Sequence, residues 1–279
     1  MSRFIVSSAS GSNGEGYGSV LSFSSDGQLL GSFSEDERIS DPRGMSIGPE
    51  NGLAYINSGP DRVLAFNQDG VVVHDSGNIS GLDPGGGVFA PDGRFCVTLR
   101  RRGTVFAFSP SLDRGTVLLP DNSVPFPRGF GFGSDSRIFL SSGIGPSGEG
   151  DNSIAVFAGA GEQVVPRLVD DPKLSPLDLT VSPGGNLVVN SEWPFGAPNA
   201  QVSVREYDSS TGELLRVLTP DPRIGFARPR GLRLSIDDDR LYCVGKDHVV
   251  AYEYSSGKFL GVRAELSGLN GQAVAVLPN

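Results

Sequence analysis

The chain has 279 residues, including 39 Gly, 20 Pro, 2 Cys and 2 His, and its formal net charge is −9. Two cysteines exclude a disulfide framework, and no Cys/His cluster has the spacing of zinc ligands. No apolar run approaches the ~18 residues of a membrane span, and the N-terminal residues lack the pattern of a signal peptide. We therefore expect a cytoplasmic protein with no membrane partner.

The predicted elements are short β-strands that recur in similar units. Residues 3–33 contain three strands, and units of four strands then begin at Pro42, Pro84, Pro127, Pro176 and Pro229. The C-terminal NGQAVAVLPN matches the first strand of a unit. Apolar residues alternate within the units, as in LAYI at 53–56 and VLAF at 63–66, which is typical of half-buried strands. No stretch of a dozen residues has helical periodicity.

Tight-turn residues separate the predicted strands. Two-residue hairpins need a positive φ, which glycine supplies after Asp, Asn or another small residue. The turn pairs are Asp26-Gly27, Asn51-Gly52, Asp69-Gly70, Asp92-Gly93, Gly184-Gly185, Thr211-Gly212 and Ser256-Gly257. These turns indicate antiparallel sheets built from hairpins.

The repeat has a period of about 40 to 50 residues and closes on itself. Equivalent positions are Gly44, Gly86, Gly129, Asp178, Gly231 and Gly271, at spacings of 42, 43, 49, 53 and 40 residues. A blade split between the two termini pairs strand edges that would otherwise be exposed. We predict an all-β, six-bladed β-propeller with four antiparallel strands per blade. It forms one domain over 1–279: blade six joins 270–279 to 1–40, and blades one to five begin near 41, 83, 126, 175 and 228.

Short motifs in the units resemble those of a known family. PRGMSI at 42–47, PRGLRL at 229–234 and SPGGNLVV at 182–189 resemble NHL repeats. More loosely, the units are similar to YVTN, gluconolactonase-type and streptogramin-lyase propellers. The resemblance covers the whole chain and implies the propeller fold. Proteins of this kind include scaffolds, RNA binders, lactonases and lyases, so the fold does not choose among these functions.

Three arginines mark one end of the propeller axis. Arg43, Arg128 and Arg230 precede the repeat position in alternate blades and should point into the channel mouth. Guanidinium groups bind carboxylate or phosphate in a bidentate manner, which favours an anion-binding pocket. The alternative is that they pair with local acids such as Asp41 or Glu15. Arg101 adds positive charge on the same face.

Long loops on this face carry further candidates. SSASGSNGEGYG and SSGIGPSGEGDN place Glu15 and Glu149 in blades three apart, facing each other across the axis. They can hold a Ca²⁺ or Mg²⁺ ion or transfer protons; alternatively they are solvated or pair with arginines. Trp193 and Phe195 form either an apolar wall beside the arginines or a small satellite core.

His248 and three polar residues complete the candidate set. His248 lies in a crossing loop of blade five, and its ordinary pKa suits a general base. The resemblance to streptogramin lyases, which use a histidine on this face, supports it. In the gluconolactonase-type metal site, Glu, Asn and Asp lie where the innermost strands begin. Only Asn270, and Asp178 after a one-residue shift, match that pattern here, and Asn190 is a further candidate ligand.

Two classes of function follow. The first is an enzyme, a lyase or hydrolase acting on a small anionic, partly aromatic substrate at the channel mouth. The second is a non-catalytic propeller that binds a peptide, a protein or, less in keeping with the net charge of −9, RNA. The sequence does not indicate the oligomeric state.

Overall fold

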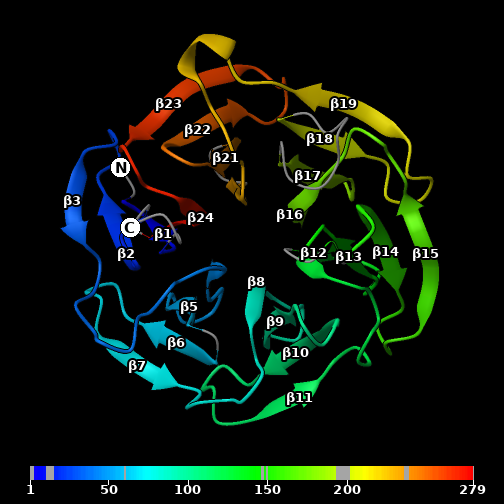
Figure 1. Ribbon diagram of the computed structural model, residues 1–279, viewed down its shortest axis with the longest axis horizontal. Coiled ribbons are helices and arrows are strands. Elements are labelled where there is room, and N and C mark those ends of the chain that lie inside the picture. Colours follow the sequence, from blue (N-terminus) through cyan, green and yellow to red (C-terminus); the bar gives the residue numbers. More distant parts are fainter. Residues whose placement is uncertain are drawn as a thin grey trace.

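The computed structural model describes residues 3–10, 16–59, 61–145, 148, 150–192, 202–235 and 239–278. Within these residues the chain forms six four-stranded sheets arranged as blades around a central axis (Figure 1). Neighbouring strands in every blade are antiparallel, as in the pair β5–β6. The one helix in this part of the chain is the short 3-10 helix η1 (Pro222–Ile224). The predicted six-bladed β-propeller is confirmed.

Blades one to three follow the chain from the axis outward. Blade one contains β4 (Met45–Ile47), β5 (Ala54–Ser58), β6 (Arg62–Phe66) and β7 (Val72–Asp75). Blade two contains β8 (Pro84–Phe89), β9 (Phe95–Leu99), β10 (Thr104–Phe108) and β11 (Gly115–Val117). Blade three contains β12 (Pro127–Phe132), β13 (Ile138–Ser142), β14 (Ser153–Phe157) and β15 (Gln163–Val169).

Blades four to six continue in the same way. Blade four contains β16 (Pro176–Val181), β17 (Leu187–Ser191), β18 (Ser203–Tyr207) and β19 (Leu214–Leu218). Blade five contains β20 (Gly231–Ser235), β21 (Arg240–Val244), β22 (His248–Glu253) and β23 (Phe259–Glu265). Blade six contains β24 (Gly271–Val276), β1 (Phe4–Ser8), β2 (Ser19–Phe23) and β3 (Leu29–Ser32).

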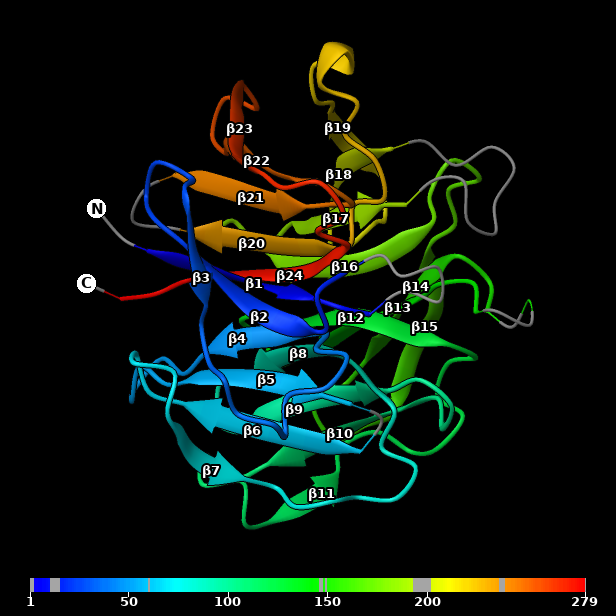
Figure 2. The ribbon, with the colours of Figure 1, turned by 60° about the vertical axis from the view of Figure 1, so that its left-hand side comes forward.

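Blade six is built from both ends of the chain. β24 pairs antiparallel with β1, with Val6 opposite Val274 and Phe4 opposite Val276, and the two strands run side by side in Figure 2. The backbone N–H of Leu277 also donates to the carbonyl of Arg3 at 2.8 Å. The pairing places the innermost strand β24 beside a neighbour that is distant in sequence, and so closes the ring as predicted.

The predicted turns have the required backbone conformation. In each of the seven pairs, the glycine at the second position has a positive φ, between 66° and 88°. At Gly70 the turn also approaches the preceding blade, since a Cβ there would lie 1.8 Å from the carbonyl oxygen of Phe33. Glycine is therefore needed at this turn both for its φ and for the close approach.

The repeat position lies where innermost strands meet around the axis. Each innermost strand contacts the innermost strands of both neighbouring blades. A Cβ on Gly44 would lie 2.4 Å from the carbonyl oxygen of Gly85, and one on Gly129 would lie 2.5 Å from the Cα of Asp178. At these positions a side chain would meet the backbone of the next blade, which explains why five of the six repeat positions are glycine.

Apolar side chains fill the interfaces between neighbouring blades. Each of the six interfaces has one cluster of buried residues. Between blades one and two, for example, Tyr55, Phe95 and Phe108 are almost fully buried. Cys96 and Cys243 are free and buried within such clusters, so both thiols belong to the core. Among the described residues no helix is long and apolar enough to span a membrane.

Candidate functional site

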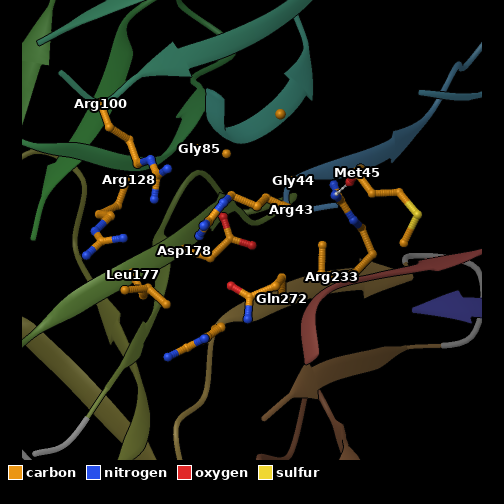
Figure 3. Close-up of a pocket in the computed structure, with 14 residues that line it drawn as sticks. Arg43, Gly44, Met45, Gly85, Arg100, Arg128, Leu177, Asp178, Arg233 and Gln272 are labelled. Carbon is orange, nitrogen blue, oxygen red and sulfur yellow. Dashed lines mark hydrogen bonds between the residues drawn. The ribbon is translucent and has the colours of Figure 1, made fainter. Parts of the chain in front are cut away.

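The innermost strands begin around one end of the axis, which we call the upper mouth. A cavity of about 60 Å³ lies there. Its lining includes all three predicted arginines, from blades one, three and five, together with Asp178 (Figure 3). The structure therefore brings these four residues together at one site.

Two of the three arginines have carboxylate partners. Arg43 donates from Nη2 to Asp41 Oδ2 at 2.6 Å, which is one of the local pairings that the sequence left open. Arg230 donates from Nε to Glu192 Oε1 and from Nη1 to Asn270 Oδ1, both at 3.1 Å. Glu192 is buried, with 4% of its surface exposed, and the Arg230 guanidinium compensates its negative charge.

Arg128 differs from the other two arginines. Its Nη2 donates to the carbonyl oxygen of Ile144 at 2.9 Å, and its guanidinium lies 4.5 Å from the centre of the Phe126 ring. Its Nε is buried without a hydrogen-bond partner, and among the described residues no carboxylate forms an ion pair with it. Burial, followed by the nearby charge of Arg100, lowers the pKa of Arg128 to about 10. The group stays charged at neutral pH, and in the described part of the chain no carboxylate lies within ion-pair distance of it.

Asp178 occupies the repeat position that is glycine in the other five blades. Oδ1 accepts from the backbone N–H of Leu179 at 3.0 Å, and Oδ2 accepts from that of Leu232 in the next blade at 2.9 Å. Burial raises the pKa of Asp178 to about 6, although Arg233 and these two N–H groups act in the opposite direction. A carboxyl with this pKa, beside a cavity, exchanges its proton readily near neutral pH.

Two further arginines line the cavity: Arg100, which the sequence places on this face with Arg101, and Arg233, which the sequence did not identify. Arg100 pairs with Asp83, and its Nε is buried without a partner. Arg233 lies two residues after the repeat position of blade five. Alternation along a strand places it on the same side as that position, so the period of two was the available signal.

The predicted metal ligands already have protein partners. Asn190 Oδ1 accepts from the backbone N–H of Asp178 at 2.7 Å, so this amide positions the strand that carries the carboxyl. Asn270 accepts from Arg230 and donates from Nδ2 to the carbonyl of Ala9 at 2.9 Å. Within the described residues, no group of three or more His, Cys, Asp and Glu side chains comes together in a way that would hold a metal ion.

His248 and Arg101 are not among the residues that line the upper-mouth cavity. His248 begins β22, where its Nε2 lies 3.9 Å from Glu265 Oε1 on the outermost strand and its Nδ1 is buried without a partner. The Arg101 side chain is 84% exposed, and its Nε lies 3.4 Å from Asp83 Oδ2. Glu15, Glu149, Trp193 and Phe195 lie outside the described residues.

The comparisons with known proteins concern the fold. No protein-family model matches the sequence, and no curated protein has significant sequence similarity to it. The structure is similar to one in a crystal structure of the nidogen/laminin complex, with a TM-score of 0.73 and 12% identity over 100% of this chain and 99% of that chain.

Two lyase structures are also similar. A catalytically inactive virginiamycin B lyase from Staphylococcus aureus with quinupristin has a TM-score of 0.60 and 12% identity, over 94% of this chain and 84% of that one. A streptogramin B lyase has a TM-score of 0.58 and 16% identity, over 85% and 75%. At these identities the likeness shows the propeller fold, which enzymes and binding proteins share.

Proposed function

We propose that the protein binds a small anionic molecule at the upper mouth and acts on it as a lyase or hydrolase. The observation that carries this proposal is that Arg128, a cation with no carboxylate partner among the described residues, lines the same cavity as Asp178. The first group supplies an anchor for an anion, and the second supplies a site for proton transfer. Perturbed titratable groups of opposite charge in one cavity are typical of functional sites.

The size of the cavity limits what enters it. A volume of about 60 Å³ has room for roughly four water molecules, which corresponds to one carboxylate or phosphate group. The remainder of the substrate would then lie outside, toward the loops of the upper face. Arg128 would form an ion pair with the bound anion. Arg43 and Arg230, which are paired with Asp41 and Glu192, would lie on either side of it.

Asp178 would act as the base once the anion is bound. For a substrate carboxylate, Asp178 takes the proton from the adjacent carbon, and the C–H electron pair moves into an enolate. The guanidinium groups stabilise the charge of this enolate. Loss of a leaving group from the next carbon completes an elimination, and return of the proton restores the substrate. In a hydrolase, the same carboxylate would instead take a proton from the water that attacks an acyl carbon.

Anion binding can be tested without knowing the substrate. Phosphate, malonate and citrate should each raise the melting temperature of the wild-type protein, by roughly 5 °C at a hundredfold excess over Kd. Arg128→Gln should abolish the shift. Arg223→Gln is the matched control: Arg223 is 88% exposed and pairs with Asp221 away from the cavity, so this variant should respond as the wild type does. Equal shifts in all three proteins would refute the anion site.

Catalysis can be tested by proton exchange. Small carboxylic acids and lactones incubated with the protein in D₂O should lose their α-proton signals or be converted, as followed by ¹H NMR. Asp178→Asn should abolish the reaction and leave anion binding in place. If anions bind but no compound in the panel exchanges or reacts faster with the wild type than with Asp178→Asn, the enzyme assignment fails and the binding assignment stands.

The alternative, a module for peptide or protein recognition, predicts an exposed apolar patch on the loop face. Among the described residues, the exposed large apolar side chains lie instead mainly on or beside the outermost strands, such as Leu30 on β3, Val117 on β11 and Leu215 on β19. Tyr17, in a loop of the upper face, is 50% exposed and is the exception. The partner class remains a prediction, and the cavity favours a small anion.

A further inference from the structure

The opposite end of the axis carries a second and larger cavity. We call it the lower mouth, where the innermost strands end. Its volume is about 670 Å³, within the range of about 300–1,000 Å³ that is typical of sites for drug-sized ligands. Asp178 and Arg233 line both cavities, so the inner ends of the two mouths meet at these side chains.

The wall of the lower mouth is largely apolar. Four successive blades each contribute a half-buried apolar residue from the end of the innermost strand: Ile47, Phe89, Phe132 and Val181. Each of these side chains packs on one side against a core cluster between blades and lines the cavity on the other. This wall suits the apolar or aromatic body of a ligand.

Arg233 supplies a charged group at the inner end. Its Nη2 donates to the carbonyl oxygen of Met45 at 2.6 Å, and Figure 3 shows this contact on the side of Asp178 away from Arg100 and Arg128. Its Nε is buried without a hydrogen-bond partner. In the described part of the chain no carboxylate lies within ion-pair distance of Arg233, although the nearby Asp178 carboxyl attracts its charge. The guanidinium therefore keeps an unused donor at Nε.

We propose that the lower mouth is a second ligand site, which takes a small amphipathic carboxylate. The body of the ligand lies on the apolar wall, and its carboxylate accepts hydrogen bonds from Arg233. At the rim Glu50 is exposed, and its negative charge disfavours a ligand with a second anionic group at the far end. The site thus selects monocarboxylates with an aromatic or aliphatic body. It goes beyond the proposed function, which uses the upper mouth, and the two sites meet at Asp178 and Arg233.

The test begins with the wild-type protein and three probes: 2-naphthoate, octanoate and the neutral 2-naphthylmethanol. With the upper mouth saturated by phosphate, the carboxylates should bind with one-to-one stoichiometry in calorimetry and compete with each other. The alcohol should bind about 10- to 100-fold more weakly, because it lacks the charge-assisted hydrogen bonds to Arg233. In methyl-labelled protein, the carboxylates should shift the signals of Val181 and Leu232, which line only the lower mouth, and not those of Leu177, which lines only the upper mouth.

Variants locate the site independently. Thr180 is half-buried and lines only the lower mouth, so Thr180→Trp should narrow the cavity and weaken binding, whereas Thr180→Val should bind as the wild type does. Arg233→Gln should remove the preference for 2-naphthoate over the alcohol. Arg128→Gln, which removes the upper-mouth anchor, should leave the affinity for 2-naphthoate unchanged.

Three results would overturn the proposal. The first is that neither carboxylate binds to the wild-type protein at millimolar concentration. The second is that the shifts fall on Leu177 and binding is lost in Arg128→Gln, which would place the ligand in the upper mouth. The third is unchanged affinity in a folded Thr180→Trp variant. The wild-type methyl shifts decide the question if that variant does not fold.

Discussion

Replacing Asp178 with asparagine should change how the stability of the protein depends on pH. Burial raises the pKa of this carboxyl from 3.8 to about 6 in the folded protein. The folded state therefore binds the proton more tightly than the unfolded state. The resulting stabilisation is fully present below the unfolded pKa and is lost as the pH rises through the folded pKa. A difference of about two pKa units corresponds to about 3 kcal/mol.

The measured quantity is the free energy of unfolding of the wild type minus that of Asp178→Asn. This difference should fall by about 2.4 kcal/mol between pH 4 and pH 7, because pH 4 lies just above the unfolded pKa and the asparagine does not titrate. Urea denaturation at pH 4, 5, 6 and 7 provides both values, and the contributions of all other titrating groups cancel in the subtraction. A difference that stays constant or rises with pH would refute the assignment of a buried, proton-binding carboxyl to the axis.

Asp113 provides a control of opposite sign. It lies in the exposed turn between β10 and β11, where hydrogen bonds from Ser109 and Ser111, at 2.6 and 2.7 Å, hold its pKa below the ordinary value. A group of this kind stabilises the folded state above its unfolded pKa. For Asp113→Asn, the free energy of unfolding of the wild type minus that of the variant should therefore rise as the pH increases through the acidic range. The corresponding difference for Asp178→Asn should fall with increasing pH.

Three further predictions concern the fold. Gly70→Ala should lower the free energy of unfolding by about 1–3 kcal/mol, because its Cβ would lie 1.8 Å from the carbonyl oxygen of Phe33 at a φ of 77°; an unchanged urea midpoint would contradict this. Deleting residues 271–279 should abolish cooperative unfolding, since it leaves β1 without its innermost partner; circular dichroism melting checks it. Ellman's reagent at pH 8 should label neither Cys96 nor Cys243 in the native protein, and both in urea, because burial raises both thiol pKa values; rapid native labelling would show that the core opens.

The two cavities meet at Asp178. Arg128 lines only the upper-mouth cavity, whereas Arg233 and Asp178 line both. A ligand carboxylate placed near Asp178 from either side would favour the protonated form of that carboxyl. The pH dependence of stability and the two binding experiments therefore all depend on the protonation of Asp178.

The sequence by itself determined the blades and their closure. The spacing from Gly44 to Gly271 set the number of blades, because a ring of closely packed innermost strands accepts almost no side chain at that position. Turn pairs such as Asp69-Gly70 set the hairpins, because a positive φ is a local requirement. The division of a repeat between the N- and C-terminal segments determined the pairing of β1 with β24. These are properties of short stretches and of a fixed period, and both can be read along a chain.

Only the tertiary structure decided which side chains form the site. Arg43 finds Asp41 two residues away, but Arg230 meets Glu192 across 38 positions of sequence, and Arg128 is left with no carboxylate among the described residues. Asp178 was visible as the exception to glycine, yet its role depends on burial and on an N–H from Leu232 in the next blade. Charge compensation and desolvation arise from contacts between blades, and no period in the sequence encodes which partner a side chain will meet.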